Sequence, residues 1–270
     1  MKQFNDERDY HDMFDDIFDK WNVTTFFQPI IDTRANRVYG IDATAWLQSK
    51  GSNCTDFISP HDFLTAAEKS GEIISITKEL LLQIQDYLAN HGDIDKCREL
   101  RFFIKISPLH LFSENIMEFA EDCIQTAKKL DKLNAKLVIE VNSRIPFDLI
   151  HKLKLLSALL TIQKNTFFAL GDFGAGHSNI EMLFGFDFDY IKIDKSMFFP
   201  LTDKVIMHGF ADDLMSGLSK QNTDIIVSGI DSVYHLQYFL NKNVSLFQGE
   251  LFKAPVAYKN FNGLDYFDYG

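Results

Sequence analysis

The stretch Ala169-Leu170-Gly171-Asp172-Phe173-Gly174-Ala175-Gly176 decides the fold prediction. An apolar run from Thr166 leads into it and closely spaced glycines end it, which predicts a buried strand followed by a tight turn. Such a turn lets a ligand approach the backbone, and the Asp172 carboxylate at its mouth is a metal-binding group. A site for two metal ions would need a second acid beside it, and Gly171 stands there. The stretch therefore predicts a site that lacks part of its chemistry.

Outward from this stretch, seven further apolar runs predict strands, because β-branched and aromatic residues dominate them. The eight runs are Phe26–Ile31, Val38–Trp46, Arg101–Ser107, Leu137–Val141, Thr166–Asp172, Tyr190–Asp194, Ile225–Ile230 and Leu246–Phe252. A short polar turn joins only the first pair, which predicts an antiparallel hairpin. Most of the segments between the later strands have apolar residues at helical spacing, which predicts helices. Alternating strands and helices predict a (β/α)₈-type barrel, with a doubly wound open sheet as the alternative.

Composition bounds the class of protein. The chain has 270 residues, 46% of them hydrophobic, enough for a large core. A formal net charge of −11 argues against direct nucleic-acid binding. The 3 cysteines show no CxxC spacing, as expected of a reducing compartment. No signal-peptide core or membrane span is apparent, so we expect a cytoplasmic protein without membrane contact.

Three segments are predicted along the chain. Residues 1–24 read as an N-terminal amphipathic helix, residues 25–258 as the barrel and residues 259–270 as a C-terminal tail. The helix has an apolar face that either packs across the barrel or docks another protein. The tail aromatics, and those of Phe184–Phe188, are likewise open between packing on the barrel and anchoring a partner.

In such barrels the functional side chains lie at the carboxyl ends of the strands. The polar residues predicted there, in strand order, are Gln28, Asp42, Lys105, Glu140, Asp172, Lys192 with Asp194, Ser228 with Asp231, and Gln248. Carboxylates and two lysines around one opening suggest metal-assisted phosphate chemistry or a structural ion-pair network.

The ordered motifs resemble the EAL-type cyclic di-GMP phosphodiesterase family from about Phe26 to Pro255. They are Phe27-Gln28-Pro29-Ile30, Gly40-Ile41-Asp42-Ala43, Phe173-Gly174-Ala175-Gly176, Ile191-Lys192-Ile193-Asp194 and Gln248-Gly249. The resemblance implies a TIM-like (β/α)₈ barrel with an antiparallel first strand, which agrees with the hairpin. It also implies an activity that needs two divalent metal ions held by acids and an asparagine.

The resemblance implies which site residues are kept and which are replaced. The remnants of the catalytic set are Asp42, which replaces a glutamate, Glu140, Asp172 and Lys192, and the remnants of the ligand-binding set are Gln28, Asp194 and Gln248. The lost positions are Ala45 for a phosphate-binding arginine, Lys105 for the ligand asparagine, Ser143 and Gly171 for acids, and Ser228 for a glutamate. Asp231 keeps an acid, and Glu250 stands where an aromatic is usual.

These losses predict that no metal and no other cofactor is bound, because Mg²⁺ and Mn²⁺ require several hard oxygen ligands. A protonated Lys105 supplies no lone pair and would instead neutralise Glu140 and Asp42 or Asp172, unless it extends to solvent. Asp172 and Lys192 have structural alternatives, as a turn-stabilising acid and a salt-bridge partner. His177 is expected to be a local cap rather than a ligand.

The function expected is therefore non-catalytic regulation through a protein partner, for example a transcriptional regulator. Degenerate members of the family act in this way on motility, biofilm or virulence genes, and the resemblance implies that class without identifying the partner. Cyclic di-GMP binding is not expected, because Ala45 cannot pair with a phosphate and the chain is acidic. A cyclic di-GMP receptor without hydrolysis and a weak phosphodiesterase stay as alternatives.

Overall fold

The computed structural model describes residues 21–50, 57–91, 99–112, 114–141, 146–161, 166–173, 180–198, 206–218 and 223–262. Its strands are β1 (Trp21–Asp32), β2 (Arg37–Ser49), β3 (Phe57–Ile58), β4 (Arg101–Ile106), β5 (Lys136–Val141), β6 (Thr166–Phe173), β7 (Tyr190–Asp194), β8 (Asp224–Ser228), β9 (Leu246–Gln248) and β10 (Val256–Ala257). Its α-helices are α3 (Pro60–Ser70), α4 (Ile73–His91), α6 (Ile116–Asp131), α7 (Ile150–Thr161), α8 (Ile180–Gly185), α9 (Ile206–Leu218) and α10 (Val233–Leu240). Short 3₁₀ turns are η1 (Pro108–Leu111), η2 (Phe147–Leu149), η3 (Lys195–Met197) and η4 (Tyr258–Asn260).

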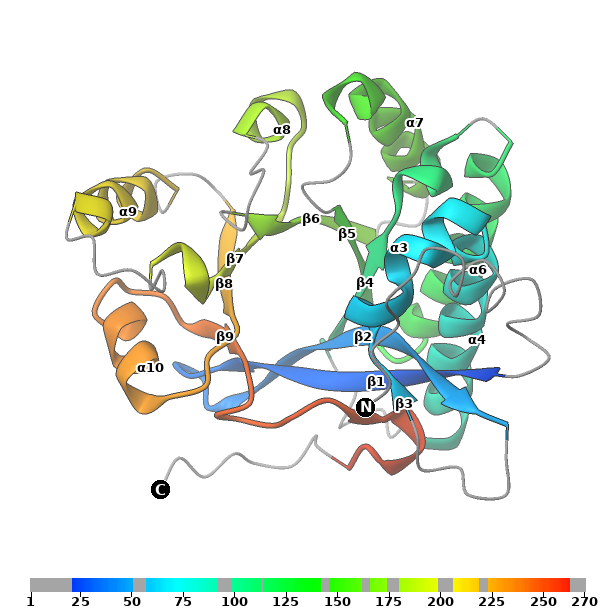
Figure 1. The fold of residues 1–270 in the computed structure, drawn as a ribbon, viewed down its shortest axis with the longest axis horizontal. Helices are drawn as coiled ribbons and strands as arrows, with labels where there is room; N and C mark the ends of the chain where they lie inside the picture. The colour runs from blue at the N-terminus through cyan, green and yellow to red at the C-terminus, as the bar shows by residue number, and fades with distance from the viewer. Residues whose placement is uncertain are drawn as a thin grey trace.

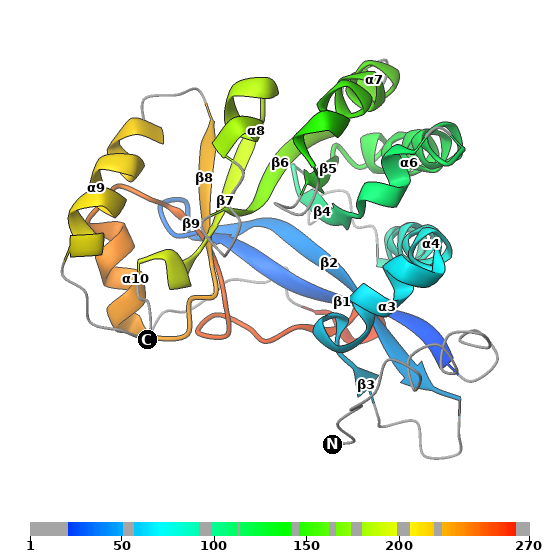
Figure 2. The ribbon, with the colours of Figure 1, turned by 45° about the horizontal axis from the view of Figure 1, so that its top comes forward.

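The sheet closes into a barrel. Strands β2, β4, β5, β6, β7, β8 and β9 pair in parallel in that order, and β1 pairs antiparallel with both β2 and β9. The strands form a ring in Figure 1, with the helices outside it (Figure 2). The TIM-like barrel with an antiparallel first strand is thus confirmed, and the open sheet is excluded because both of its edges meet at β1.

The β1–β2 hairpin positions two residues of the predicted site. Its turn is stabilised by Asp32, whose Oδ1 accepts hydrogen bonds from the backbone N–H groups of Arg34 and Ala35. The register places Gln28 directly opposite Asp42. Directly paired residues on antiparallel strands present their side chains on the same face, so both reach the barrel mouth.

Apolar side chains fill the interior below the mouth and the layer between strands and helices. The inner cluster contains Ile30, Phe103, Val138, Ala169 and Ile226. At the amino-terminal end of the strands, the Tyr39 and Tyr190 hydroxyls lie 3.2 Å apart, and Arg101 Nε donates to Tyr190 Oη at 2.9 Å. Among the described residues, the interior of the barrel is therefore packed at this end, and a cavity lies at the opposite end.

Several predicted boundaries require correction. Strand β1 begins at Trp21, so the predicted helix over 1–24 is wrong for residues 21–24, which pair with Trp46–Ser49 of β2. Residues 1–20 lie outside the described residues. The eighth strand ends at Gln248 rather than Phe252, because a Cβ at Gly249 would lie 1.9 Å from the Ile230 carbonyl oxygen and the chain turns there.

The predicted tail is attached to the barrel at its start. Phe261 is buried, and its ring makes edge contacts with Phe27 and Tyr87. Of the two alternatives for the tail aromatics, Phe261 therefore packs on the barrel. Residues 263–270 lie outside the described part of the chain. In the described helices, none is long and apolar enough to cross a membrane.

Candidate functional site

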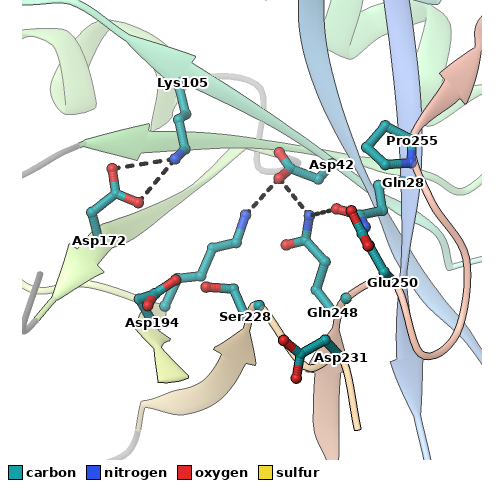
Figure 3. A pocket seen from close by; sticks show the side chains of 13 residues that line it. Gln28, Asp42, Lys105, Asp172, Asp194, Ser228, Asp231, Gln248, Glu250 and Pro255 are labelled. Carbon is teal, nitrogen blue, oxygen red and sulfur yellow. Dashed lines mark hydrogen bonds and ion pairs between the residues drawn. The ribbon is translucent and has the colours of Figure 1, made fainter. Parts of the chain in front are cut away.

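A cavity of about 440 Å³ opens at the carboxyl ends of the parallel strands, where the sequence predicted the site (Figure 3). It is lined by Gln28, Asp42, Lys105, Asp172, Lys192, Asp194, Ser228, Gly229, Asp231, Gln248, Gly249, Glu250 and Pro255. Nearly all of the predicted polar residues therefore converge. Glu140 lies beneath them, fully buried, and contacts the lysines of the wall.

Lys192 is a buried ion-pair centre rather than a free catalytic base. Its Nζ lies 2.7 Å from Asp42 Oδ2 and 3.0 Å from Glu140 Oε2. Burial alone would lower the Lys192 pKa, but the Asp42 and Glu140 charges raise it above its ordinary value. Burial would likewise raise the Asp42 pKa, but Lys192 and Lys105 lower it. Lys192 and Asp42 are therefore both charged at neutral pH. The contacts of Lys192 are those of a salt-bridge partner, which was the structural alternative to a catalytic role.

Lys105 makes the second half of this network. Its Nζ lies 3.0 Å and 3.2 Å from the two Asp172 oxygens and 3.3 Å from Glu140 Oε1. Burial would lower the pKa of Lys105, and the charges of Glu140, Asp172 and Asp42 more than reverse this effect. Extension to solvent is therefore wrong, and the predicted internal pairing is what the structure contains. Glu140 is shared by two ammonium groups (the Lys105 pairs with Asp172 are dashed in Figure 3).

Gln248 and Gln28 continue the network onto the antiparallel strand. Gln248 Nε2 donates to Asp42 Oδ2 at 2.8 Å and to Gln28 Oε1 at 2.7 Å. Gln28 Nε2 in turn donates to the Lys253 backbone carbonyl at 3.0 Å. The amide hydrogens that line this wall are thus used within the protein, and the side-chain oxygens Asp42 Oδ1 and Gln248 Oε1 stay buried without a hydrogen-bond partner among the described residues.

The position of Glu140 in this ion-pair network requires a glycine at position 171. A Cβ at this position would lie 2.2 Å from Glu140 Oε1 and 2.6 Å from Glu140 Cγ, far inside contact distance. The neighbouring Asp172 has a φ of 51° in the left-handed region, at an irregularity in the pairing of β6 with β7. Glu140 therefore occupies the space that a side chain at 171 would need, and the loss of an acid there and the position of Glu140 are linked.

Asp194 and Ser228 act locally in the structure. Asp194 Oδ1 caps η3 by accepting the Ser196 N–H at 2.8 Å, and Ser228 Oγ donates to the Ile193 carbonyl at 3.4 Å. Neither contact reaches the Lys192 centre, although both residues line the cavity. Their predicted roles as ligand-binding remnant and lost acid stay predictions.

Asp231 has partners that sequence reasoning missed. It is paired with Lys195 Nζ and with His235 Nδ1, the latter at 2.7 Å. Asp231 and His235 are separated by four positions at the start of α10, and this spacing was the available signal.

Ala45 does not lie where its predicted role requires. It is buried in the outer hydrophobic core and does not line the cavity, since strand residues alternate faces and Asp42 points inward. Thr44 and Trp46 follow Asp42 on its face, and neither carries a charge, so this face still has no arginine for a phosphate. Ser143 and His177 lie outside the described residues, so their predicted roles are untested.

The residues present do not fit the pair of divalent ions that the family resemblance implies. Asp42, Glu140 and Asp172 already have ammonium groups within 3.3 Å or less, Lys105 brings a positive charge among them, and Gly171 offers no ligand. Within the described ranges, no group of three or more His, Cys, Asp or Glu is placed to hold a metal ion. A cation would have to displace the partly exposed Lys105 and the buried Lys192 from the acids that they already neutralise.

Comparison with known proteins places the chain. A model of the EAL domain matches residues 12–255, so the chain belongs to the EAL domain family. It is 28% identical over 239 residues to the probable cyclic di-GMP phosphodiesterase PdeG of Escherichia coli strain K12, covering 87% of this chain and 45% of PdeG. It is 29% identical over 209 residues to the cyclic di-GMP phosphodiesterase PdeL of the same strain, covering 77% and 56%. The chain thus spans about half the length of these relatives.

Solved EAL domains share the fold. The FimX EAL domain of Pseudomonas aeruginosa, solved with cyclic di-GMP, superposes with a TM-score of 0.69 at 18% identity, covering 97% of this chain and 100% of that one. The PaMucR phosphodiesterase, also solved with cyclic di-GMP, gives a TM-score of 0.67 at 19% identity, covering 87% and 92%. The family and barrel predictions are confirmed, and the relatives are phosphodiesterases or binders of cyclic di-GMP.

Proposed function

We propose that this EAL domain is a non-catalytic regulator that acts by binding a protein partner. The observation that supports this most strongly is the Lys105 ammonium between Glu140 and Asp172, which fills the place of a metal ligand with a fixed positive charge. An ammonium neutralises the acids but supplies no Lewis acid and activates no water. The barrel then serves as a rigid scaffold, and a fold of this kind supports new functions through its surface.

The partner class follows from the family rather than from a single contact. Degenerate EAL domains control motility, biofilm or virulence genes by contacting proteins, and a transcriptional regulator is the partner we propose. Exposed apolar residues give such a partner hydrophobic contacts, and the most exposed are Met117 at 60%, Tyr234 at 69% and Phe184 at 82%. The test is affinity purification from the native bacterium, followed by reconstitution of the captured pair from purified proteins. A complex that forms with the isolated partner supports the proposal, and failure of every captured protein to bind in isolation contradicts it.

Cyclic di-GMP hydrolysis is the alternative that the names of the relatives favour, since PdeG and PdeL are described as phosphodiesterases. Incubation of the purified protein with cyclic di-GMP and Mn²⁺ tests it, with Lys192→Ala as the control. We expect no linear product above that control. Product well above it would overturn the non-catalytic assignment.

Cyclic di-GMP binding without hydrolysis has one observation in its favour, because Gln28, Lys192 and Gln248 are present at the cavity. Their polar groups are committed to one another and to Asp42, however, so a dinucleotide would have to break these contacts. Calorimetry distinguishes the cases: no heat of binding is expected, and micromolar affinity would establish a nucleotide receptor.

A further inference from the structure

The cavity at the carboxyl ends of the strands is acidic. Its wall carries the carboxylates of Asp42, Asp172, Asp194, Asp231 and Glu250 and the ammonium groups of Lys105 and Lys192. Asp231 is paired with Lys195 outside the wall, so acidic groups still outnumber the ammonium groups around the opening. The buried Glu140 below adds another negative charge. A cavity with this excess of negative charge repels an anion and attracts a cation.

Both lysines of the wall are held by carboxylates, whereas two of the acidic groups that line the cavity have no ion pair among the described residues. Lys192 is held by Asp42 and Glu140, and Lys105 by Asp172 and Glu140. Among the described residues, Glu250 has no ion pair, and the described contact of Asp194 is one backbone N–H from Ser196. The charge that remains to be neutralised therefore lies on the Asp194 and Glu250 sides of the opening (Figure 3).

A second observation is independent of the charge count. Asp42 and Gln248 are each only 5% exposed and line the cavity, yet Asp42 Oδ1 and Gln248 Oε1 have no hydrogen-bond partner among the described residues. A buried acceptor without a hydrogen-bond partner destabilises the protein, so a ligand that brings donors is favoured. The donors of this wall, Lys192 Nζ and Gln248 Nε2, already point at protein oxygens. The wall thus has hydrogen-bond acceptors without a partner, whereas these donors are already used within the protein.

We propose that the cavity receives an arginine side chain of the protein partner. This inference rests on the proposed function and specifies how the partner is recognised. A guanidinium carries five N–H donors, no acceptor and a permanent positive charge, which complements a wall of carboxylate and amide oxygens. Its planar fork pairs with carboxylates in a bidentate manner. The volume of about 440 Å³ accommodates the side chain with its hydration.

The test uses the whole chain, labelled with ¹⁵N, and a blocked Gly-Arg-Gly peptide as the probe. A citrulline peptide of the same shape lacks the charge and serves as the ligand control. We expect the arginine peptide alone to shift the side-chain amide resonances of Gln28 and Gln248 and the backbone resonances of Gly229 and Gly249. The double variant Asp194→Asn/Glu250→Gln should weaken this binding at least tenfold, since both carboxylates without an ion pair lose the charge that attracts the guanidinium. The matched control Glu121→Gln, exposed on α6, should leave it unchanged.

Three results would overturn the inference. These are equal shifts with the citrulline peptide, affinity unaffected by the double variant, and no shift with the arginine peptide. In each case a purified partner that still binds the domain elsewhere would leave the proposed function standing. If cyclic di-GMP produced the same shifts while the arginine peptide did not, the inference and the proposed function would both fail.

Discussion

Replacing Lys105 with methionine tests the electrostatic role of this side chain. The change keeps most of the aliphatic length and removes the ammonium, which leaves the fully buried Glu140 to share Lys192 with Asp42. Removing one partner of a buried pair costs roughly 3–5 kcal/mol. The Lys105 side chain is 35% exposed, so solvent screens part of this and we expect about 2–3 kcal/mol of lost unfolding free energy. Urea unfolding followed by circular dichroism measures it.

Two controls separate a buried charge effect from a general one. Lys78→Met breaks a surface pair of 2.7 Å with Glu118, whose side chains are 47% and 63% exposed, and should change stability little. Glu140→Gln in the Lys105→Met background removes the stranded charge, so the double variant should be more stable than Lys105→Met alone. The reasoning is refuted if Lys105→Met costs no more than Lys78→Met, or if the two changes at 105 and 140 are additive.

Two further predictions concern packing and pH. Gly171→Ala should destabilise the fold by about 1–3 kcal/mol, because the added Cβ would overlap Glu140. The control Gly209→Ala, which has open space around it, should be neutral or slightly stabilising. Equal stabilities of the two variants in urea would contradict this prediction. Burial lowers the pKa of His110 from 6.5 to about 4, so the unfolded chain binds the proton first and stability should fall by about 3 kcal/mol as the pH drops through that window. His110→Asn should flatten this slope and His61→Asn, whose side chain is 96% exposed, should not; an unchanged slope in His110→Asn would rule the assignment out.

Much of the fold could be predicted because the strands are apolar runs whose chemistry is local. The eight barrel strands occur where the runs predicted them, and the single polar turn correctly indicated the hairpin. The errors lie at the ends of strands, where contacts with residues distant in the sequence decide the boundary. Nothing local to Gly249 shows that Ile230 will pack against its backbone and end β9. Trp21 fits the helical spacing of the apolar residues that precede it in the sequence, but residues 21–24 pair with β2 and form a strand.

The site was predictable in its members but not in all of its contacts. The pairing of Lys105 with Glu140 and Asp172 followed from charge neutralisation. The sequence could not predict that Glu140 fills the space beside Gly171, because three-dimensional packing sets the rotamer of a side chain. Ala45, the position where the resemblance implies a lost arginine, faces the hydrophobic core and not the cavity, because strand residues alternate faces and Asp42 points inward. The pairs that Asp231 makes with Lys195 and His235 were missed.

The ammonium groups of Lys105 and Lys192 hold the acids of the barrel mouth, and we propose that they leave no place for paired metal ions. Titration of the purified protein with Mn²⁺, followed by electron paramagnetic resonance, tests this directly. The account predicts that the spectrum of free aqueous Mn²⁺ grows in proportion to the metal added, in the native chain and in Asp172→Asn alike. Tight uptake of two spin-coupled Mn²⁺ ions per chain, abolished by Asp172→Asn, would contradict it.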